Sequence, residues 1–141
     1  MLLKVFIVIA LVAMPLAACQ EPQGPETVTF RDRNLEAAIS DALGKPVGEE
    51  ITSDELAELT TLRAERSDIT DLSGLEYCTN LTGLYLDGNQ ISDISPLVEN
   101  SGLGVGVMIY LRENKLDLNE GSEDIENINV LKDRGVEIHY Y

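Results

Sequence analysis

Residues 81–97 read LTGLYLDGNQISDISPL, and residues 59–75, twenty-two positions earlier, read LTTLRAERSDITDLSGL. The apolar residues recur at the same places in both segments. A fixed period of this length is typical of a solenoid, in which each coil buries its apolar side against its neighbours. The period therefore predicts the fold, a short stack of coils that share one core.

The second segment assigns a physical role to each part of a coil. Leu84 and Leu86 alternate with Tyr85, so the leucines should point into the coil and the tyrosine outward from a short strand. Asn89 follows the strand, where the backbone turns. Its amide has both donors and acceptors, so it can form hydrogen bonds with the unpaired backbone groups of the turn and with those of the next coil. Such asparagines would form a ladder along the solenoid. Pro96 indicates a convex side that needs no regular helix.

The preceding coil is a degenerate copy with smaller side chains. Ala64 takes the place of the strand leucine and Ser67 that of the asparagine, as expected near an end of the array. Cys78 lies twenty-two residues after Leu56, in an apolar spine between the coils. We expect it to be buried and inert.

A third coil repeats the strand and the ladder over residues 109–116. Its Asn114 lies twenty-five residues after Asn89, and the three extra residues fall within residues 101–106, which hold three glycines. Glycine permits unusual backbone angles, so this segment predicts a bulging, mobile loop on the convex side. Asn100 occupies the spine position, where we expect the spine to be broken.

Both ends of the array have sequence signals of caps. Residues 34–43 have a helical pattern that ends at Gly44, and Thr52 with Glu55 forms a capping box for a short second helix. Ser122 can begin a helix over residues 123–133, and the alternating residues 136–141 should add a last parallel strand.

The segment 81–97 resembles the leucine-rich repeats of internalin-like bacterial surface proteins, and residues 30–46 resemble the amphipathic cap that opens such arrays. The resemblance covers residues 28–141. It implies an α/β fold, a short leucine-rich-repeat solenoid with parallel strands on its concave face. We expect an N-terminal helical cap over residues 28–58, repeats over residues 59–118 and a C-terminal helix-strand cap over residues 119–141.

The N-terminus reads as a targeting signal. Lys4 precedes an apolar run that is too short for a comfortable membrane span, so residues 1–18 are typical of a signal peptide. Residues 16–19, LAAC, resemble a bacterial lipobox, which implies cleavage before Cys19 and its modification with acyl chains such as palmitate. Residues 19–27 would be a polar tether. The expected location is the extracytoplasmic face of the cell membrane, to which the acyl chains would anchor the protein. The alternative is ordinary secretion, in which Cys19 keeps a free thiol.

Charge and cysteine content restrict the classes of function. The chain has 10 basic and 25 acidic side chains, a net charge of −15. Such a charge argues against nucleic-acid binding, which needs cations to displace the counterions of phosphate. With Cys19 acylated, one cysteine remains and no disulfide framework is possible.

No catalytic set is present in the sequence. His139 is the only histidine, and it lies on the expected last strand, so we expect neither an enzyme nor a cofactor. Residues 117–124 are acidic and suggest calcium as an alternative. An EF-hand would need glycine in place of Ser122 and glutamate in place of Ile128.

The outward positions of the strands are the candidate contact surface. We expect Tyr85 and Tyr110 to stack, with Arg63 and Arg112 beside them. Tyrosine and arginine are enriched at interface hot spots, although β propensity alone also favours such residues on strands. The candidate partner-binding residues are Arg63, Glu65, Tyr85, Asp87, Tyr110, Arg112, Glu137 and His139.

These observations predict a monomeric recognition module that binds a protein or, with less support, a glycan. Four strands about 4.8 Å apart offer a face on the order of 250 Å², whereas a standard interface takes about 800 Å² from each partner. A partner must therefore also touch the caps or the glycine loop, or be small. The alternatives are a structural spacer without a ligand and a calcium-dependent module.

Overall fold

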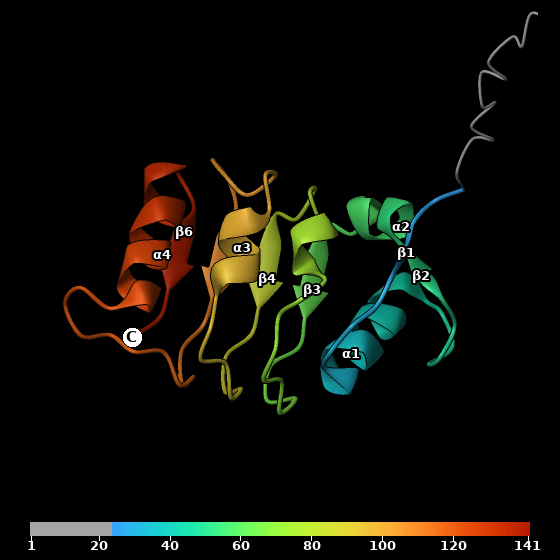
Figure 1. Cartoon of the computed structure of the whole chain (residues 1–141), viewed down its shortest axis with the longest axis horizontal. Coiled ribbons are helices and arrows are strands. Elements are labelled where there is room, and N and C mark those ends of the chain that lie inside the picture. The colour runs from blue at the N-terminus through green and yellow to red at the C-terminus, as the bar shows by residue number, and fades with distance from the viewer. Residues whose placement is uncertain (1–23) are drawn as a thin grey trace, which may run out of the picture.

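The computed structural model describes residues 24–141, so the signal peptide and Cys19 lie outside the described residues. These residues form an elongated stack with helical elements at one end, four strands along it and a helix at the other end (Figure 1). No helix within residues 24–141 is long and apolar enough to cross a membrane. The expected solenoid is confirmed.

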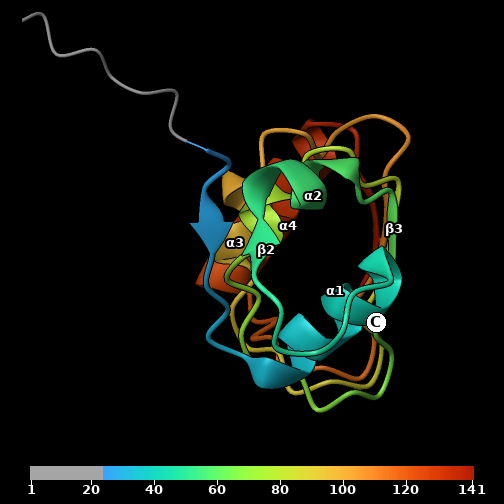
Figure 2. The same cartoon turned by 90° about the vertical axis from the view of Figure 1, so that its right-hand side faces the viewer.

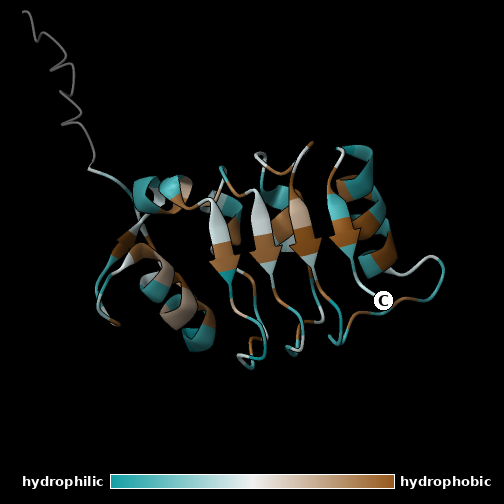
Figure 3. Ribbon diagram, turned by 180° about the vertical axis from the view of Figure 1, so that it is seen from behind, coloured by the Kyte–Doolittle hydropathy of each residue, from teal (hydrophilic) through white to brown (hydrophobic). Residues whose placement is uncertain are grey.

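The four strands form one parallel sheet in the order in which they occur in the chain. They are β3 (Thr61–Arg63), β4 (Gly83–Tyr85), β5 (Met108–Tyr110) and β6 (Glu137–His139). Leu62 lies opposite Leu84, and the same row continues to Ile109 and Ile138. This row points into the core, so the outward residues on either side of it also lie in rows (Figure 3).

Helical segments cover the opposite side of the coils. They are the 3₁₀ turn η1 (Leu75–Tyr77), the short helix α3 (Ser95–Glu99) and the longer α4 (Glu123–Asp133). Viewed along the solenoid, β3 lies on one side and α3 and α4 lie on the other (Figure 2). The sequence predicts a convex side that needs no regular helix at Pro96, and the structure has the five-residue helix α3 there. Pro96 sits in its first turn, where a backbone N–H needs no helical partner.

Asparagine side chains join neighbouring coils. The Oδ1 atom of Asn89 accepts hydrogen bonds from Ser67 N (2.9 Å) and Ile69 N (3.0 Å). Its Nδ2 atom donates to Ala64 O and Leu86 O, both at 2.8 Å. Asn89 is almost fully buried, so these four bonds replace the water that the backbone groups have lost. The ladder predicted from Asn89 is confirmed.

The N-terminal cap begins earlier than expected. Strand β1 (Thr27–Val28) pairs antiparallel with β2 (Ile51–Thr52). Thr27 lies opposite Thr52, so the end of the segment that we assigned to the tether is part of the folded cap. Each of these strands has only two residues. An alternating pattern cannot be recognised in so short a segment, so the sequence does not reveal them.

Two helices complete this cap. Helix α1 (Arg33–Leu43) ends at Gly44 in the left-handed conformation, and α2 (Ser53–Glu58) has the expected capping box between Thr52 and Glu55. The Nζ atom of Lys45 lies 2.8 Å from Oε1 of Glu55. This hydrogen bond is the largest of several interactions that lower the pKa of Glu55 to about 2.

Asp32 connects the cap to the first coil. One carboxylate oxygen accepts from Asn34 N (2.8 Å) and Leu35 N (3.1 Å), which caps α1. The other accepts from Thr70 N (2.6 Å) and Asp71 N (3.2 Å) in the first coil. Burial alone would raise the pKa of Asp32, but these hydrogen bonds outweigh it and the pKa is lowered.

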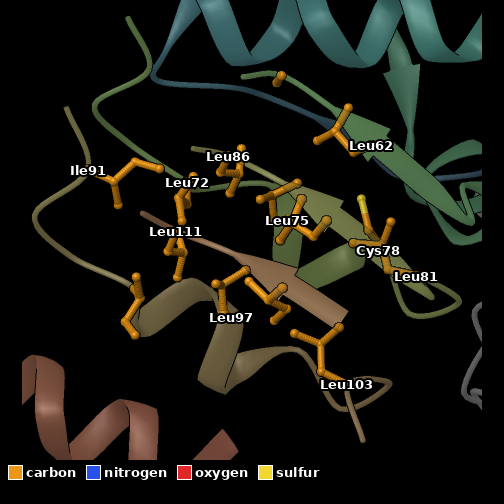
Figure 4. Packing of buried hydrophobic residues seen from close by; sticks show 14 of the residues in the cluster. Leu62, Leu72, Leu75, Cys78, Leu81, Leu86, Ile91, Leu97, Leu103 and Leu111 are labelled. Atoms are coloured by element: carbon orange, nitrogen blue, oxygen red, sulfur yellow. The ribbon is translucent and has the colours of Figure 1, made fainter. Parts of the chain in front are cut away.

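One continuous apolar core runs through the coils (Figure 4). Leu75, Cys78 and Leu97 are fully buried within it. Burial raises the pKa of the Cys78 thiol to about 12, so the thiolate needed for reactivity is not available at neutral pH. Cys78 is a core residue, as its spacing from Leu56 predicts.

The third coil differs from the expectation in two respects. Asn100 does not break the spine: it is fully buried, and its Nδ2 atom donates to Leu75 O (2.8 Å) and Cys78 O (2.9 Å) of the preceding coil. The glycine loop that follows is anchored rather than loose, because Leu103 is buried in the core. Val105 is the apolar residue of the loop that protrudes, with 90% of its surface exposed.

The close approach of Gly102 to the preceding coil makes a test of this packing. A Cβ at position 102 would collide with the carbonyl of Thr79. We expect Gly102→Ala to lower the free energy of unfolding by about 1–3 kcal/mol, as overpacking does. Urea unfolding measures this change.

Gly104→Ala is the matched control in the same loop. There a Cβ would lie 3.4 Å from its nearest neighbour, the Arg134 carbonyl oxygen, which is close to ordinary contact. We expect a change within about 0.5 kcal/mol. Equal effects of the two substitutions would contradict the close packing of this loop.

Candidate functional site

The outward row at the C-terminal ends of the four strands is a continuous stack of side chains. Arg63, Tyr85, Tyr110 and His139 lie opposite one another on the four strands. The rings of Tyr85 and Tyr110 are parallel within 7°, with centroids 5.0 Å apart. His139 stacks on Tyr110 at 4.7 Å, and the Arg63 guanidinium carbon lies 4.1 Å from the centroid of Tyr85.

The spacing of the strands accounts for this stack. Parallel strands lie about 4.8 Å apart, which is close to the separation that stacked rings prefer. The backbone therefore brings the rings to contact distance without bending the sheet. Arg63 adds a cation–π contact at one end, of a kind worth about 0.5–1 kcal/mol at an exposed site.

Each ring leans back along its own strand toward the residue two positions before it. Gly83 leaves room for Tyr85, because a Cβ at position 83 would lie 3.1 Å from Cε2 of that ring. The hydroxyl of Tyr110 approaches Sδ of Met108 at 4.0 Å. The Nε2 atom of His139 lies 3.0 Å from Oε1 of Glu137, which completes the pattern.

The two tyrosines offer their ring edges, not their ring faces, to a ligand. Tyr85 has Arg63 on one face and Tyr110 on the other, and Tyr110 lies between Tyr85 and His139. Both tyrosines are half-buried in the described structure. The row is thus a rigid ridge with exposed polar edges.

The remaining predicted residues flank the ridge in different ways. Glu65 lies 3.7 Å from Arg63, an ion pair that is exposed and therefore weak. Asp87 accepts a hydrogen bond from the backbone N–H of Arg112 at 2.7 Å. Arg112 does not flank the tyrosines as expected: it lies two residues beyond Tyr110 and outside the stack, and His139 takes the flanking place.

The sequence contains a signal for this end of the stack. Residues 136–140 repeat the alternation of residues 107–111, and this alignment sets His139 against Tyr110. The alignment gives the position of His139 but not the direction in which its ring leans. Lys132 and Tyr140, which lie near this end, were not among the predicted residues.

The acidic loop considered for calcium has internal hydrogen bonds. Oδ2 of Asp124 accepts from Asp117 N at 2.8 Å, and Oδ1 of Asp117 accepts from Asn119 N at 3.1 Å. Within residues 24–141 no group of three or more acidic, histidine or cysteine side chains is placed to hold a metal ion. The calcium alternative therefore gains no support from this loop.

Known proteins share this repeat and this stack of coils. The family model for leucine-rich repeats in two copies matches residues 57–99. Internalin H of Listeria monocytogenes is 42% identical over 66 residues, which are 46% of this chain and 12% of that protein. The crystal structure of the internalin inlF from the same species has 30% identity, with a TM-score of 0.52 over 67% of this chain and 34% of that one. Over these residues the chain is similar to internalins and to their leucine-rich repeats.

A further internalin-like structure covers more of the chain. The functional domain of InlJ from Listeria monocytogenes has a TM-score of 0.56 and 27% identity over 79% of this chain, but only 22% of that domain. The internalin-like chain thus spans a small part of the length of each of these relatives. The similarity includes the repeats and the parallel sheet on which the ridge lies.

Proposed function

We propose that this protein is a membrane-anchored, extracytoplasmic leucine-rich-repeat lipoprotein that recognises another protein through non-covalent contacts. The observation that carries the proposal is the stacked row of Arg63, Tyr85, Tyr110 and His139 on the open face of the sheet. The similarity to internalins, whose repeats match this chain, supports the same class of function.

Preorganisation makes this ridge suitable for binding. Ordering a side chain on association costs about 0.5–1.5 kcal/mol. The rings of Tyr85 and Tyr110 are already held by their neighbours, so less of that cost remains at the moment of binding. Tyrosine and arginine are also the residue types that contribute most at interfaces.

The exposed chemistry favours a protein over a glycan. A sugar ring stacks on an open aromatic face, and both faces of Tyr85 and Tyr110 are covered. What remains open is a set of ring edges with hydroxyl groups and charged neighbours. These groups suit the polar and apolar mosaic of a protein surface.

The partner must extend beyond the ridge. The face of the four strands is on the order of 250 Å² in projection, well below the contribution of about 800 Å² that a standard interface needs. Met108 is 37% exposed beside the ridge, and Val105 protrudes from the glycine loop just before β5. These residues are the natural extension of the contact surface.

Catalysis is not part of the proposal. The one histidine is stacked on Tyr110 and paired with Glu137, which leaves it without a nucleophile to activate. Cys78 is buried with a raised pKa. The rival function is that of an envelope spacer, in which the same stack only stabilises the sheet as cross-strand pairs do.

Site-specific photo-crosslinking separates recognition from the spacer function. A photoreactive phenylalanine analogue at Met108, beside the ridge, should give one discrete protein adduct when the full chain is expressed in its own host. The same analogue at Val47, an exposed residue of the N-terminal cap, should not.

The adduct should depend on the ridge. We expect it to disappear in the double variant Tyr85→Ala with Tyr110→Ala and to persist in Tyr77→Ala, which removes a tyrosine from the opposite side of the coils. Thermal unfolding shows whether each variant is folded. Absence of a discrete adduct from Met108, or its persistence in the double variant, would favour the spacer.

The anchor rests on the sequence LAAC at residues 16–19 and on the polar segment after it. A single acyl chain binds a membrane marginally, whereas two or more hold a protein stably. We expect the protein extracted from membranes to begin at Cys19 and to carry the mass of its acyl chains. Intact-mass measurement checks this, with Cys78→Ala as the control that keeps the lipid. An unmodified Cys19 would contradict the anchor.

A further inference from the structure

A small hollow of about 210 Å³ lies at the β6 end of the ridge. Its walls are Arg112, Ile138, His139, Tyr140 and Tyr141. Pockets for drug-sized ligands measure about 300–1,000 Å³. This hollow is smaller, so its size suits one side chain of a partner rather than a separate small molecule.

The backbone groups of β5 and of the residues that follow it bond alternately to the last strand and to the preceding coil. The backbone N–H of Leu111 still donates to His139 O at 2.7 Å. Both backbone groups of Arg112 instead bond to the preceding coil: its N–H donates to Oδ1 of Asp87 at 2.7 Å and its carbonyl accepts from Gly88 N at 2.8 Å. Arg112 is thereby fixed at one wall.

The opposite wall is also held in place. The Nζ atom of Lys132 donates to the hydroxyl of Tyr140 at 2.9 Å, and that hydroxyl lies 3.0 Å from the hydroxyl of Tyr141. The rings of Tyr140 and Tyr141 lie 4.3 Å apart. The hydrogen bond from Lys132 is the main cause that lowers the pKa of Tyr140, which indicates a positive environment behind this wall.

The Arg112 guanidinium is the positively charged group among the residues that line the hollow. Among residues 24–141, no acidic side chain lies within 4.0 Å of the Arg112 guanidinium. The nearby acids are already engaged, Glu137 by His139 and Asp87 by the backbone of Arg112. The apolar side chain of Ile138 is mostly buried between these walls.

We propose that this hollow binds the carboxylate of a glutamate or aspartate side chain presented by the protein partner. The inference rests on the proposed recognition function and deepens it. The Arg112 guanidinium can bind a carboxylate through two parallel hydrogen bonds. The methylene groups of the partner side chain would lie against Ile138.

A single negative charge fits this hollow better than a double one. The chain carries a net charge of −15, and the carboxylates of Glu137 and Asp87 are bonded to His139 and to the backbone of Arg112, two residues that line the hollow. These charges oppose a dianionic phosphate more strongly than a carboxylate. A phosphopeptide is therefore an outcome that the test distinguishes.

Nuclear magnetic resonance titration of the full chain with blocked tripeptides tests the site. The probes are acetyl-Gly-Glu-Gly-amide, its Gln analogue and a phosphoserine analogue, each added to millimolar concentration, where contacts of this size bind. We expect saturable shifts of the Arg112 Nε–H, His139 and Tyr141 signals with the Glu peptide and none with the Gln peptide.

Substitutions of two arginines identify the contact. Arg112→Gln should weaken binding of the Glu peptide about tenfold, whereas Arg66→Gln, the same charge change outside the hollow, should change it less than twofold. The proposal would be overturned if the two arginine substitutions had equal effects or if the Glu peptide caused no saturable shift. It would also be overturned if the Gln peptide caused equal shifts or if the phosphoserine peptide bound more strongly. Loss of the carboxylate site with an intact Met108 crosslink would leave protein recognition standing.

Discussion

The side chain of Asn89 forms four hydrogen bonds in the interior of the solenoid, two to carbonyl groups and two to backbone amides of adjacent turns. A buried polar group without a partner costs about 1–3 kcal/mol. The backbone groups at the turns of the first two coils can therefore be buried at low cost only because the Asn89 amide bonds to them. Asn114 repeats the arrangement in the third coil, where its amide donates to Leu86 O and Leu111 O. The asparagines thus hold the coils at one spacing and keep the strands in register.

The proposed recognition surface depends on that register. Tyr85 and Tyr110 stack because Leu84 and Ile109, their inward neighbours, lie opposite each other. A slip of one residue would turn every outward ring into the core. The same coupling explains how a sheet with strands of only three residues can present a rigid ridge.

Much of the fold can be predicted from the sequence because the interactions that decide it are local or periodic. The repeat predicts the strands and their register, and the capping box at Thr52 and the serine at position 122 predict where two helices begin. The stack of Tyr85 on Tyr110 follows from the strand pattern that the third coil repeats, although the loop before it makes that coil three residues longer. These features need no knowledge of contacts between distant segments.

The features that the sequence does not reveal depend on long-range contacts. Asp32 bonds to Thr70 and Asp71, and its distance from them in the sequence hides the connection. Asn100 looks like a defect in an apolar spine until the carbonyls of Leu75 and Cys78 are seen beside it. The hollow beside Arg112 is lined by residues of the third coil and of the C-terminal end of the chain, and no periodicity predicts that combination.

The dependence of the structure on the asparagine ladder is tested most directly by the free energy of unfolding of Asn89→Ala. In this variant the buried backbone amides and carbonyls that bond to Asn89 would lose their partners. We expect the free energy of unfolding, measured with urea, to fall by at least about 3 kcal/mol. Asn80→Ala, which removes an exposed amide that bonds only to Ala57 O, should cost less than about 1 kcal/mol. A loss in Asn89→Ala no larger than that in Asn80→Ala would contradict the central place of the ladder.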